Sequence, residues 1–291
     1  MRIGIDLGGT KIEAIAIAAD GEQLLRKRVP TPVGDYQATL QHICALVNEI
    51  ETTLGEIGSV GIGTPGAISP ASSLLKNSNS VCMNGKPDYE DLTRLLQRDI
   101  RIANDANWFA LSEATDGAAA GAGVVFGVIV GTGTGAGVVV NGHILTGPNA
   151  IAGEWGHNPL PWPSDDERPG PACYCGKRGC IETWLSGPGM SRDYLELSGQ
   201  AVEAIEIVVQ AGQGDQVAEH CLQRYEERMA RCLAHVINIL DPDAIVLGGG
   251  ISNIQRLYTR VPAIWDRYVF SDHVDTHLLA PKYGDASGVR G

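Results

Sequence analysis

Apolar positions recur along the chain at two spacings, and these spacings predict short strands that alternate with helices. Residues 2–6 form a short apolar run that ends in Asp6, and residues 11–17 resume as a strand after a tight turn at Gly8-Gly9. Two strands joined by a glycine turn predict a hairpin. This excludes the usual glycine-rich nucleotide loops, because a Walker loop and a dinucleotide fingerprint both need a helix directly after their glycines.

A second glycine-rich turn repeats this arrangement further along the chain. An apolar run at residues 124–130 leads into Gly131-Thr-Gly-Thr-Gly135, and the following strand ends at Asn141-Gly142. Asn-Gly between apolar runs is the strongest short hairpin signal. Two such elements, one near the start of each half, suggest two related domains that close on one nucleotide. A third cluster, at residues 248–250, follows a buried strand and could let an adenine or ribose approach the backbone closely.

Helical spacing of apolar residues fills the intervals between these strands. The first helical pattern comprises Tyr36, Leu40, Ile43, Val47, Ile50 and Leu54. The second spans residues 215–240 and comprises Val217, Cys221, Leu222, Tyr225, Met229, Leu233, Val236 and Leu240. Residues 161–171 are rich in proline and acids, and they predict an irregular excursion that adds no core. The chain is therefore α/β throughout.

Size and charge narrow the possible functions. A chain of 291 residues is long enough to form two domains. Its formal net charge is −12 without any run of Lys or Arg, which argues against a nucleic-acid surface. We expect a cytoplasmic protein, because the sequence shows neither a signal peptide nor an apolar run that could span a membrane. Its seven cysteines also fit a reducing compartment better than a disulfide framework.

The first glycine turn could bind a polyanion such as ATP. An acidic protein must bind such a ligand through local groups, such as backbone amides and a bridging cation. The backbone amides of Gly8, Gly9 and Thr10 could cradle phosphate oxygens. Asp6 would then face a Mg²⁺ ion through water, because this ion gives up its hydration shell reluctantly. The alternative for this segment alone is a plain glycine hairpin with a capping aspartate.

Three closely spaced cysteines and an upstream histidine form a candidate metal site. The candidate ligands are His157, Cys173, Cys175 and Cys180. Structural zinc takes three thiolates and one imidazole readily, and two glycines between the cysteines let the short loop curl around one ion. Ordinary free thiols are the alternative. Glu154 and Glu182 flank the site, so a zinc-anchored loop would position two carboxylates that do not hold the metal.

The candidate catalytic residue lies in the first half of the chain. Asn104 and Asp105 follow a short strand and open an amphipathic helix. Helix capping alone would explain both residue types. A carboxylate near a helix N-terminus also stays ionised, and an aspartate beside an asparagine could accept the proton of a sugar hydroxyl. Phosphoryl transfer asks for little more than positioning, charge neutralisation and one proton acceptor.

The motifs together resemble the ROK group of bacterial sugar kinases, within the actin-like ATPase superfamily. They are Asp6-Leu-Gly-Gly-Thr10-Lys11, Thr64-Pro65-Gly66, Asn104-Asp105-Ala106-Asn107, Gly131-Thr-Gly-Thr-Gly135, Gly153-Glu154-Trp-Gly-His157, residues 173–182 and Leu247-Gly-Gly-Gly250. The resemblance covers nearly the whole chain. It implies an α/β fold of the actin-like ATPase (ribonuclease H-like) type, with two domains around a central cleft. The smaller domain would comprise residues 1–117, to which residues 282–291 return, and the larger domain residues 118–281.

The resemblance also implies ATP-dependent phosphorylation at a sugar 6-hydroxyl, with Asp105 as general base and ATP, Mg²⁺ and structural Zn²⁺ as cofactors. The implied sugar ligands are Gly66, Asn79, Asn104, Asp105, Glu154, His157 and Glu182. His157 would bind zinc through one ring nitrogen and face the sugar with the other. The implied nucleotide ligands are Asp6, Gly8, Gly9, Thr10, Lys11, Gly131, Thr132, Gly133, Gly248, Gly249 and Gly250.

Within the family, residues 153–162 and 240–243 look most like the fructokinase or mannofructokinase branch. D-fructose is therefore the expected substrate, with mannose as a second hexose, and N-acetylglucosamine and glucose are the alternatives. A sugar-sensing regulator without catalysis is the alternative from another class, although such a repressor would need a DNA-reading segment before the first strand. The resemblance further implies a homodimer. The family usually continues into a final helix after the segment that corresponds to residues 288–291, where this sequence stops.

Overall fold

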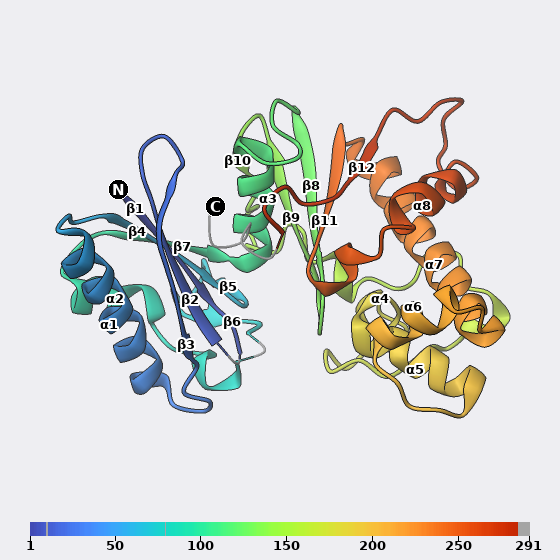
Figure 1. The fold of residues 1–291 in the computed structure, drawn as a ribbon, viewed down its shortest axis with the longest axis horizontal. Coiled ribbons are helices and arrows are strands. Elements are labelled where there is room, and N and C mark those ends of the chain that lie inside the picture. The colour runs from blue at the N-terminus through green and yellow to red at the C-terminus, as the bar shows by residue number, and fades with distance from the viewer. Residues whose placement is uncertain (10, 79, 285–291) are drawn as a thin grey trace.

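Two five-stranded sheets form the centres of two lobes (Figure 1). The computed structural model describes residues 1–9, 11–78 and 80–284. The first sheet has the order β3-β2-β1-β4-β7, with β3 Gln23–Pro30, β2 Lys11–Ile17, β1 Arg2–Leu7, β4 Ser59–Thr64 and β7 Ile100–Asn104. The second has the order β10-β9-β8-β11-β12, with β10 His143–Ile144, β9 Thr134–Val140, β8 Val124–Val130, β11 Ala244–Gly248 and β12 His277–Leu279. A small hairpin joins β5, Ala67–Ile68, to β6, Leu75–Lys76.

The helices divide between the lobes, with one helix between the two sheets. The first lobe carries α1, Tyr36–Leu54, and α2, Asp88–Leu96. The helix between the sheets is α3, Asp105–Thr115. The second lobe carries α4 Glu182–Leu185, α5 Gly187–Ser198, α6 Ala204–Gly212, α7 Gln216–Leu240 and α8 Leu257–Trp265. Among the residues that the structure describes, no helix has the length and apolar character of a membrane span.

Both predicted glycine hairpins are confirmed. Strands β1 and β2 pair antiparallel, and so do β8 and β9. Asn141 and Gly142 take φ angles of 49° and 77° between β9 and β10, as the two central positions of a tight hairpin turn require. The strands β1, β4 and β7 run parallel, so that Asp6 lies beside Gly63 and Thr64 lies beside Asn104. The carboxyl ends of three neighbouring strands therefore meet at one edge of the first sheet.

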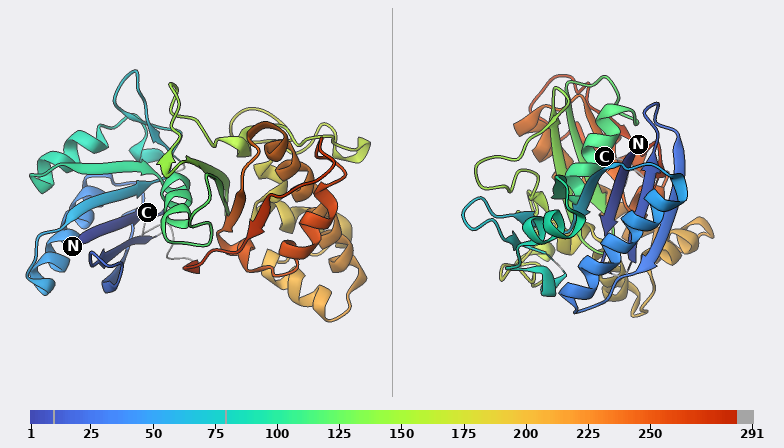
Figure 2. Two further views of the ribbon diagram at one scale, coloured as in Figure 1. Left: turned by 90° about the horizontal axis from the view of Figure 1, so that it is seen from above. Right: turned by 90° about the vertical axis from the view of Figure 1, so that its left-hand side faces the viewer.

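Helix α3 follows a strand of the first sheet but packs on the second, and it lies between the sheets in both Figure 1 and Figure 2. Phe109 and Ala110 belong to a buried cluster with side chains of β8, β9 and β11. Glycines on those strands make the close approach possible, because a Cβ at Gly127 would lie 2.6 Å from the Ala110 Cβ. On the side of the first sheet, the Trp108 indole N–H donates to the Ile62 carbonyl at 3.0 Å. The domain boundary at residue 117 stays a prediction.

Two expectations about the second lobe were wrong. The excursion at residues 161–171 was expected to add no core, yet Glu167 is buried and forms ion pairs with Arg228 and Arg231 of α7. Pairing across more than sixty residues leaves no local trace in a sequence. Val217 was expected on the buried face of α7 but is 37% exposed, because it lies in the first turn beside the cap at Asp215.

Asp88 is a buried carboxyl whose ionisation opposes folding. It is the first residue of α2, is 2% exposed, and its Oδ1 has no hydrogen-bond partner among the described residues. Burial raises the pKa of Asp88 to about 7. An acid with a raised pKa holds its proton in the folded state at a pH where the unfolded chain has lost it, so stability falls as pH rises from about 4 to about 7.

We predict that Asp88→Asn stabilises the protein by roughly 1 to 3 kcal/mol at pH 8 and by much less near pH 4. Urea unfolding at both pH values measures the difference. Asp91→Asn is the matched control on the same helix turn, because Asp91 has partners in Tyr36 and Arg94 and its loss should not stabilise. An Asp88→Asn variant with wild-type stability at pH 8 would contradict the prediction.

Candidate active site

Two carboxylates lie at the carboxyl edge of the first sheet. Asp6 is the last residue but one of β1 and is half-buried, and Asp105 opens α3 directly after β7. The Asp105 Oδ1 accepts a hydrogen bond from the Ala106 backbone N–H at 2.8 Å. Burial raises the pKa of Asp105 to about 6, and the negative charges of Asp6 and Glu154 act in the same direction. Burial and the charge of Glu13 likewise raise the pKa of Asp6.

Asn104 acts first as a structural residue in this geometry. Its Oδ1 caps α3 by accepting from the Ala106 N–H at 2.9 Å, and its Nδ2 donates to the Gly66 carbonyl at 3.1 Å. Gly66 has a φ of +91°, and a Cβ there would lie 2.4 Å from the Lys76 carbonyl oxygen. The chain segment after β6 therefore passes directly against Gly66. The predicted sugar ligand Asn79 and the predicted phosphate ligand Thr10 lie outside the described residues.

Glu154 and His157 lie on a short 3₁₀ turn that rests on β9. Two glycines allow this contact, because a Cβ at Gly153 would lie 2.1 Å from the Ala136 carbonyl oxygen and a Cβ at Gly156 2.0 Å from the Thr134 carbonyl oxygen. Burial raises the pKa of Glu154, and the charge of Glu182 adds to this, which places the two carboxylates near one another. The sequence motif therefore has a packing reason beside any functional one.

The four predicted metal ligands come together. The ligand atoms of His157, Cys173, Cys175 and Cys180 all lie within 4.8 Å of one another. The His157 Nδ1 is 3.5 Å from the Cys173 Sγ, and the Cys175 and Cys180 sulfurs are 3.6 Å apart. Gly176 and Gly179 take φ angles of 85° and 68° in the loop. Three thiolates and one imidazole in a compact cluster suit tetrahedral Zn²⁺.

Tyr174 is a neighbour of this cluster that the motifs did not indicate. Its hydroxyl is 3.0 Å from the His157 Nε2, the nitrogen that we expected to face a sugar. The two rings meet edge to face with centroids 5.1 Å apart. Burial raises the pKa of the Tyr174 hydroxyl to about 12, and the charge of Glu182 contributes. The only sequence signal was its place between two ligand cysteines.

Glu182 connects the metal loop, which comprises residues 173–180, to the second glycine turn at residues 131–135. Its Oε2 accepts a hydrogen bond from the Thr134 N–H at 3.0 Å, and a Cβ at Gly133 would lie 2.8 Å from the same oxygen. The Gly131 N–H donates to the Gly133 carbonyl at 2.9 Å, and the Gly131 carbonyl accepts from the Gly187 N–H at 2.8 Å. Thr132 is exposed at the tip. A predicted sugar ligand and a predicted phosphate loop thus share one hydrogen-bonded turn.

The other glycines that were predicted to bind the nucleotide differ in how closely other atoms approach them. The Gly8 N–H closes the first hairpin by donating to the Lys11 carbonyl at 2.9 Å, and Gly9 is exposed beside it. A Cβ at Gly248 would lie 2.6 Å from the Phe109 ring, and a Cβ at Gly249 would lie 2.4 Å from the Val130 carbonyl oxygen. Close packing therefore explains these two glycines. At Gly250 no atom lies within 4 Å of the Cβ position, so this backbone is open to a ligand.

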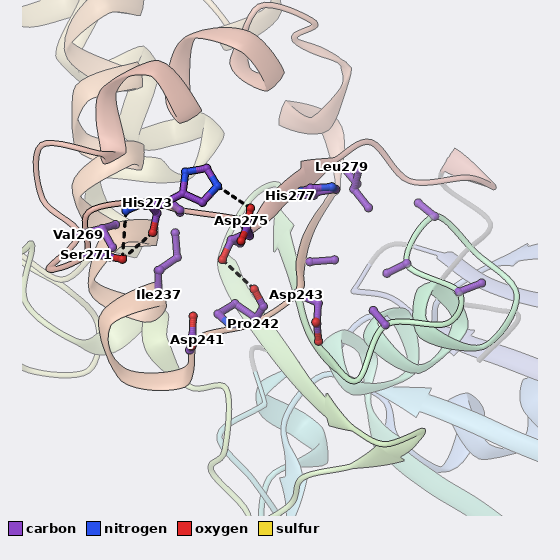
Figure 3. Close-up of a pocket in the computed structure, with 17 residues that line it drawn as sticks. Ile237, Asp241, Pro242, Asp243, Val269, Ser271, His273, Asp275, His277 and Leu279 are labelled. Atoms are coloured by element: carbon purple, nitrogen blue, oxygen red, sulfur yellow. Dashed lines mark hydrogen bonds and ion pairs between the residues drawn. The ribbon is translucent and has the colours of Figure 1, made fainter.

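Lys76 joins the two lobes near these groups. Its Nζ donates to the Asn149 carbonyl at 2.7 Å across the lobes, and its charge lowers the pKa of Glu154, against the larger effect of burial. No motif had indicated Lys76. The cavity drawn in Figure 3 lies elsewhere, between residues 118–122, the end of α7 and residues 269–279, and no predicted site residue lines it.

Two α/β lobes joined by α3, with glycine hairpins at equivalent places, confirm the expected actin-like ATPase fold, and solved structures agree. A ROK hexokinase from Thermus thermophilus superposes with a TM-score of 0.87 at 29% identity, covering 99% of this chain and 95% of that chain. A ROK family glucokinase from Streptomyces griseus, solved with glucose and AMPPNP, gives a TM-score of 0.81 at 26% identity, covering 99% and 96%.

The chain belongs to the ROK family, whose model matches residues 2–291. Similar curated proteins include the N-acetyl-D-glucosamine kinase of Pectobacterium atrosepticum, which is 40% identical over 295 residues and covers 100% of this chain and 97% of that protein. The N-acetyl-D-glucosamine kinase of Escherichia coli O127:H6 is 40% identical over 296 residues, with the same coverage. The family expectation is therefore confirmed, and these relatives are N-acetyl-D-glucosamine kinases, which was the stated alternative to the fructokinase branch.

The donor set of the metal loop yields a direct test. We predict that wild-type protein contains about one zinc per chain and that Cys175→Ser loses most of it, because three of four ligands hold the metal far less tightly. Elemental analysis by mass spectrometry on dialysed protein measures the ratio. Cys44→Ser, which removes a thiol outside the cluster, should keep the wild-type ratio. Zinc-free wild-type protein that takes up no added zinc would contradict the assignment.

Proposed function

We propose that the chain is an ATP-dependent sugar kinase that phosphorylates the 6-hydroxyl of N-acetyl-D-glucosamine. The observation that carries the reaction class is Asp105, a carboxylate at a helix N-terminus with a pKa raised to about 6. A base with a pKa near neutrality is ionised at pH 7 and still basic enough to accept a hydroxyl proton. The kinase relatives that align along the full chain support the same reading.

In the proposed mechanism, Asp105 accepts the proton of the 6-hydroxyl as that oxygen attacks the γ-phosphorus of ATP. The bond between the γ-phosphorus and the β,γ-bridging oxygen breaks, and ADP leaves. Asp6 lies close enough to raise the pKa of Asp105, so the two carboxylates form a negative pair at the sheet edge. Such a pair suits Mg²⁺, a hard cation that prefers carboxylate and water oxygens and would supply charge neutralisation at the phosphates. Asp6 would hold the ion, and Lys11 with the glycine turns of both lobes would contact the phosphates.

The sugar would lie among polar groups from both lobes. Asn104 and Gly66 come from the first lobe, and Glu154, His157 and Glu182 come from the second. Zinc would hold the His157 ring through Nδ1 and leave Nε2 to a sugar hydroxyl, in the place where Tyr174 now contacts it. Glu182 is already fixed to the turn at Thr134, so sugar and phosphate positions would be coupled through one side chain.

The choice of sugar rests on whole-chain similarity. N-acetyl-D-glucosamine kinases are 39% to 40% identical over essentially the full length. The resemblance of residues 153–162 and 240–243 to the fructokinase branch, which favoured fructose, covers only 14 positions. Fructose therefore becomes the second candidate and glucose a third. A homodimer stays a prediction.

The deciding experiment is ADP release from Mg-ATP with N-acetylglucosamine, fructose, mannose or glucose, beside a control without sugar. We expect the highest kcat/KM with N-acetylglucosamine. A higher value with fructose would restore the fructokinase assignment. Sugar binding in calorimetry without turnover on any sugar would instead favour a sugar-sensing regulator.

We predict that Asp105→Asn lowers kcat roughly a hundredfold or more and leaves the dissociation constants of sugar and ATP within about threefold, because the amide keeps the cap but accepts no proton. Steady-state kinetics and calorimetry measure the two effects. Asp116→Asn, at the other end of α3, is the matched control and should retain wild-type kcat. Near wild-type turnover by Asp105→Asn would remove this residue from the mechanism.

The raised pKa of Asp105 also predicts the pH profile. The base must be ionised to act, so kcat/KM should fall below pH 6, about tenfold for each pH unit, and level off above pH 7. The residual activity of Asp105→Asn should lack this limb. A wild-type profile that is flat down to pH 5 would contradict the assigned base.

A further inference from the structure

The short helix α4 carries Glu182 on one side and is held from behind by arginines. Trp184, two residues after Glu182, is 6% exposed. The guanidinium carbon of Arg228, on α7, lies 4.5 Å from the centroid of the Trp184 ring. Arg192 donates to the carbonyl of Thr183 in the same helix. A helix of four residues cannot hold its own orientation, so these contacts decide where its first side chain points.

Arg228 is itself fixed in a buried ion network. It is 1% exposed, and its Nε donates to the Glu167 Oε1 at 2.8 Å. Its terminal nitrogens bind both oxygens of Asp193, on α5, at 3.0 and 2.9 Å. Burial raises the pKa of Glu167, but hydrogen bonds from Arg231 and Arg228 outweigh this and hold it at about 2. Glu167 and Asp193 therefore stay ionised, and their hydrogen bonds fix the orientation of the Arg228 guanidinium.

The network joins the segments that surround Glu182. Glu167 lies in the excursion at residues 161–171, and its other oxygen accepts from the Ser164 N–H at 3.0 Å. In the same excursion, Gly170 presses on the metal loop, since a Cβ there would lie 2.5 Å from the Gly179 Cα and 3.3 Å from the Trp184 ring. Excursion, metal loop, α4 and α7 thus form one packed unit behind Glu182.

A role in stability alone is a weak explanation for this network. The desolvation cost of buried ion pairs largely offsets their attraction, and apolar side chains of similar size stabilise a core at least as well. What such a network supplies is a defined arrangement of the groups that it binds, because each hydrogen bond has a required direction. Here that arrangement includes the orientation of α4.

We propose that Arg228 is a positioning residue for sugar binding, acting through Trp184 to aim the Glu182 carboxylate. This rests on the proposed function, because it requires Glu182 to contact the sugar. The metal loop holds the same segment from the other side, through Cys180, two residues before Glu182. Arg228 does not touch the substrate.

The first test variant is Arg228→Lys, which keeps the buried charge but loses the planar fork that binds Asp193 and covers Trp184. We expect the KM for the sugar to rise about tenfold, with kcat and the KM for ATP within about twofold and with unchanged zinc content. Hydrogen exchange should show faster exchange of the amides of Thr183, Trp184 and Leu185.

A second variant and a control keep the test decisive if Arg228→Lys folds poorly. Trp184→Phe changes no charge and shrinks the ring under the guanidinium, so the sugar KM should rise about threefold. Arg256→Lys is the matched control, because the ion pairs of Arg256 within the described part of the chain go to Glu219 and Glu226 of α7 and not to α4. It should leave the sugar KM and the exchange of residues 183–185 unchanged.

The outcomes separate the two proposals. Wild-type protein that phosphorylates no sugar would overturn the proposed function. Wild-type protein with normal turnover, but with an unchanged sugar KM in both Arg228→Lys and Trp184→Phe, would overturn the role of Arg228. Equal rises in the sugar KM for Arg228→Lys and Arg256→Lys would also overturn it, because the effect would then not depend on α4.

Discussion

The close packing of α3 on the second sheet is the contact on which the rest of the arrangement depends. The helix begins at the end of a first-sheet strand, so its first residue, Asp105, belongs to the edge where Asp6 lies. Its body is buried against β8 and β9, where Gly127 and Gly137 leave room for its backbone. A methyl group at either glycine would push the helix away and move the proposed base relative to the second lobe. One helix thus sets the distance between the two halves of the site.

The carboxylates of the proposed site differ in their electrostatics from those of the arginine network behind it. Asp6, Asp105 and Glu154 have raised pKa values, because burial and the negative charges of neighbouring carboxylates act on them without a bound arginine among the causes. Glu167 and Asp193 have lowered pKa values, because arginines bind them closely. A bound cation or a proton would stabilise the carboxylates of the first group, and the proposed reaction would supply both. The carboxylates of the second group are already neutralised by arginines. This contrast separates the proposed active site from the scaffold behind it.

Much of the local structure was predictable from the sequence, and the long-range structure was not. Both glycine hairpins, the helix after Asn104 and the metal cluster were predicted, because each depends on residues close together in the chain. The contacts of Lys76 with Asn149 and of Arg228 with Glu167 join segments more than sixty residues apart, and no pattern near either partner indicates the other. The glycines at 248 and 249 were assigned to a nucleotide, and their neighbours show a packing requirement for glycine that the sequence did not reveal.

The start of β9 shows why the motifs of this family are hard to divide into functional and structural residues. Gly153 and Gly156 rest on Ala136 and Thr134, while the Thr134 N–H binds Glu182. The turn that carries Glu154 and His157 and the helix that carries Glu182 therefore both contact the start of β9, directly after the second glycine turn. A substitution on this strand would displace the proposed sugar ligands and the proposed phosphate loop together. We therefore expect sugar specificity to depend on residues behind the site as much as on the side chains within it.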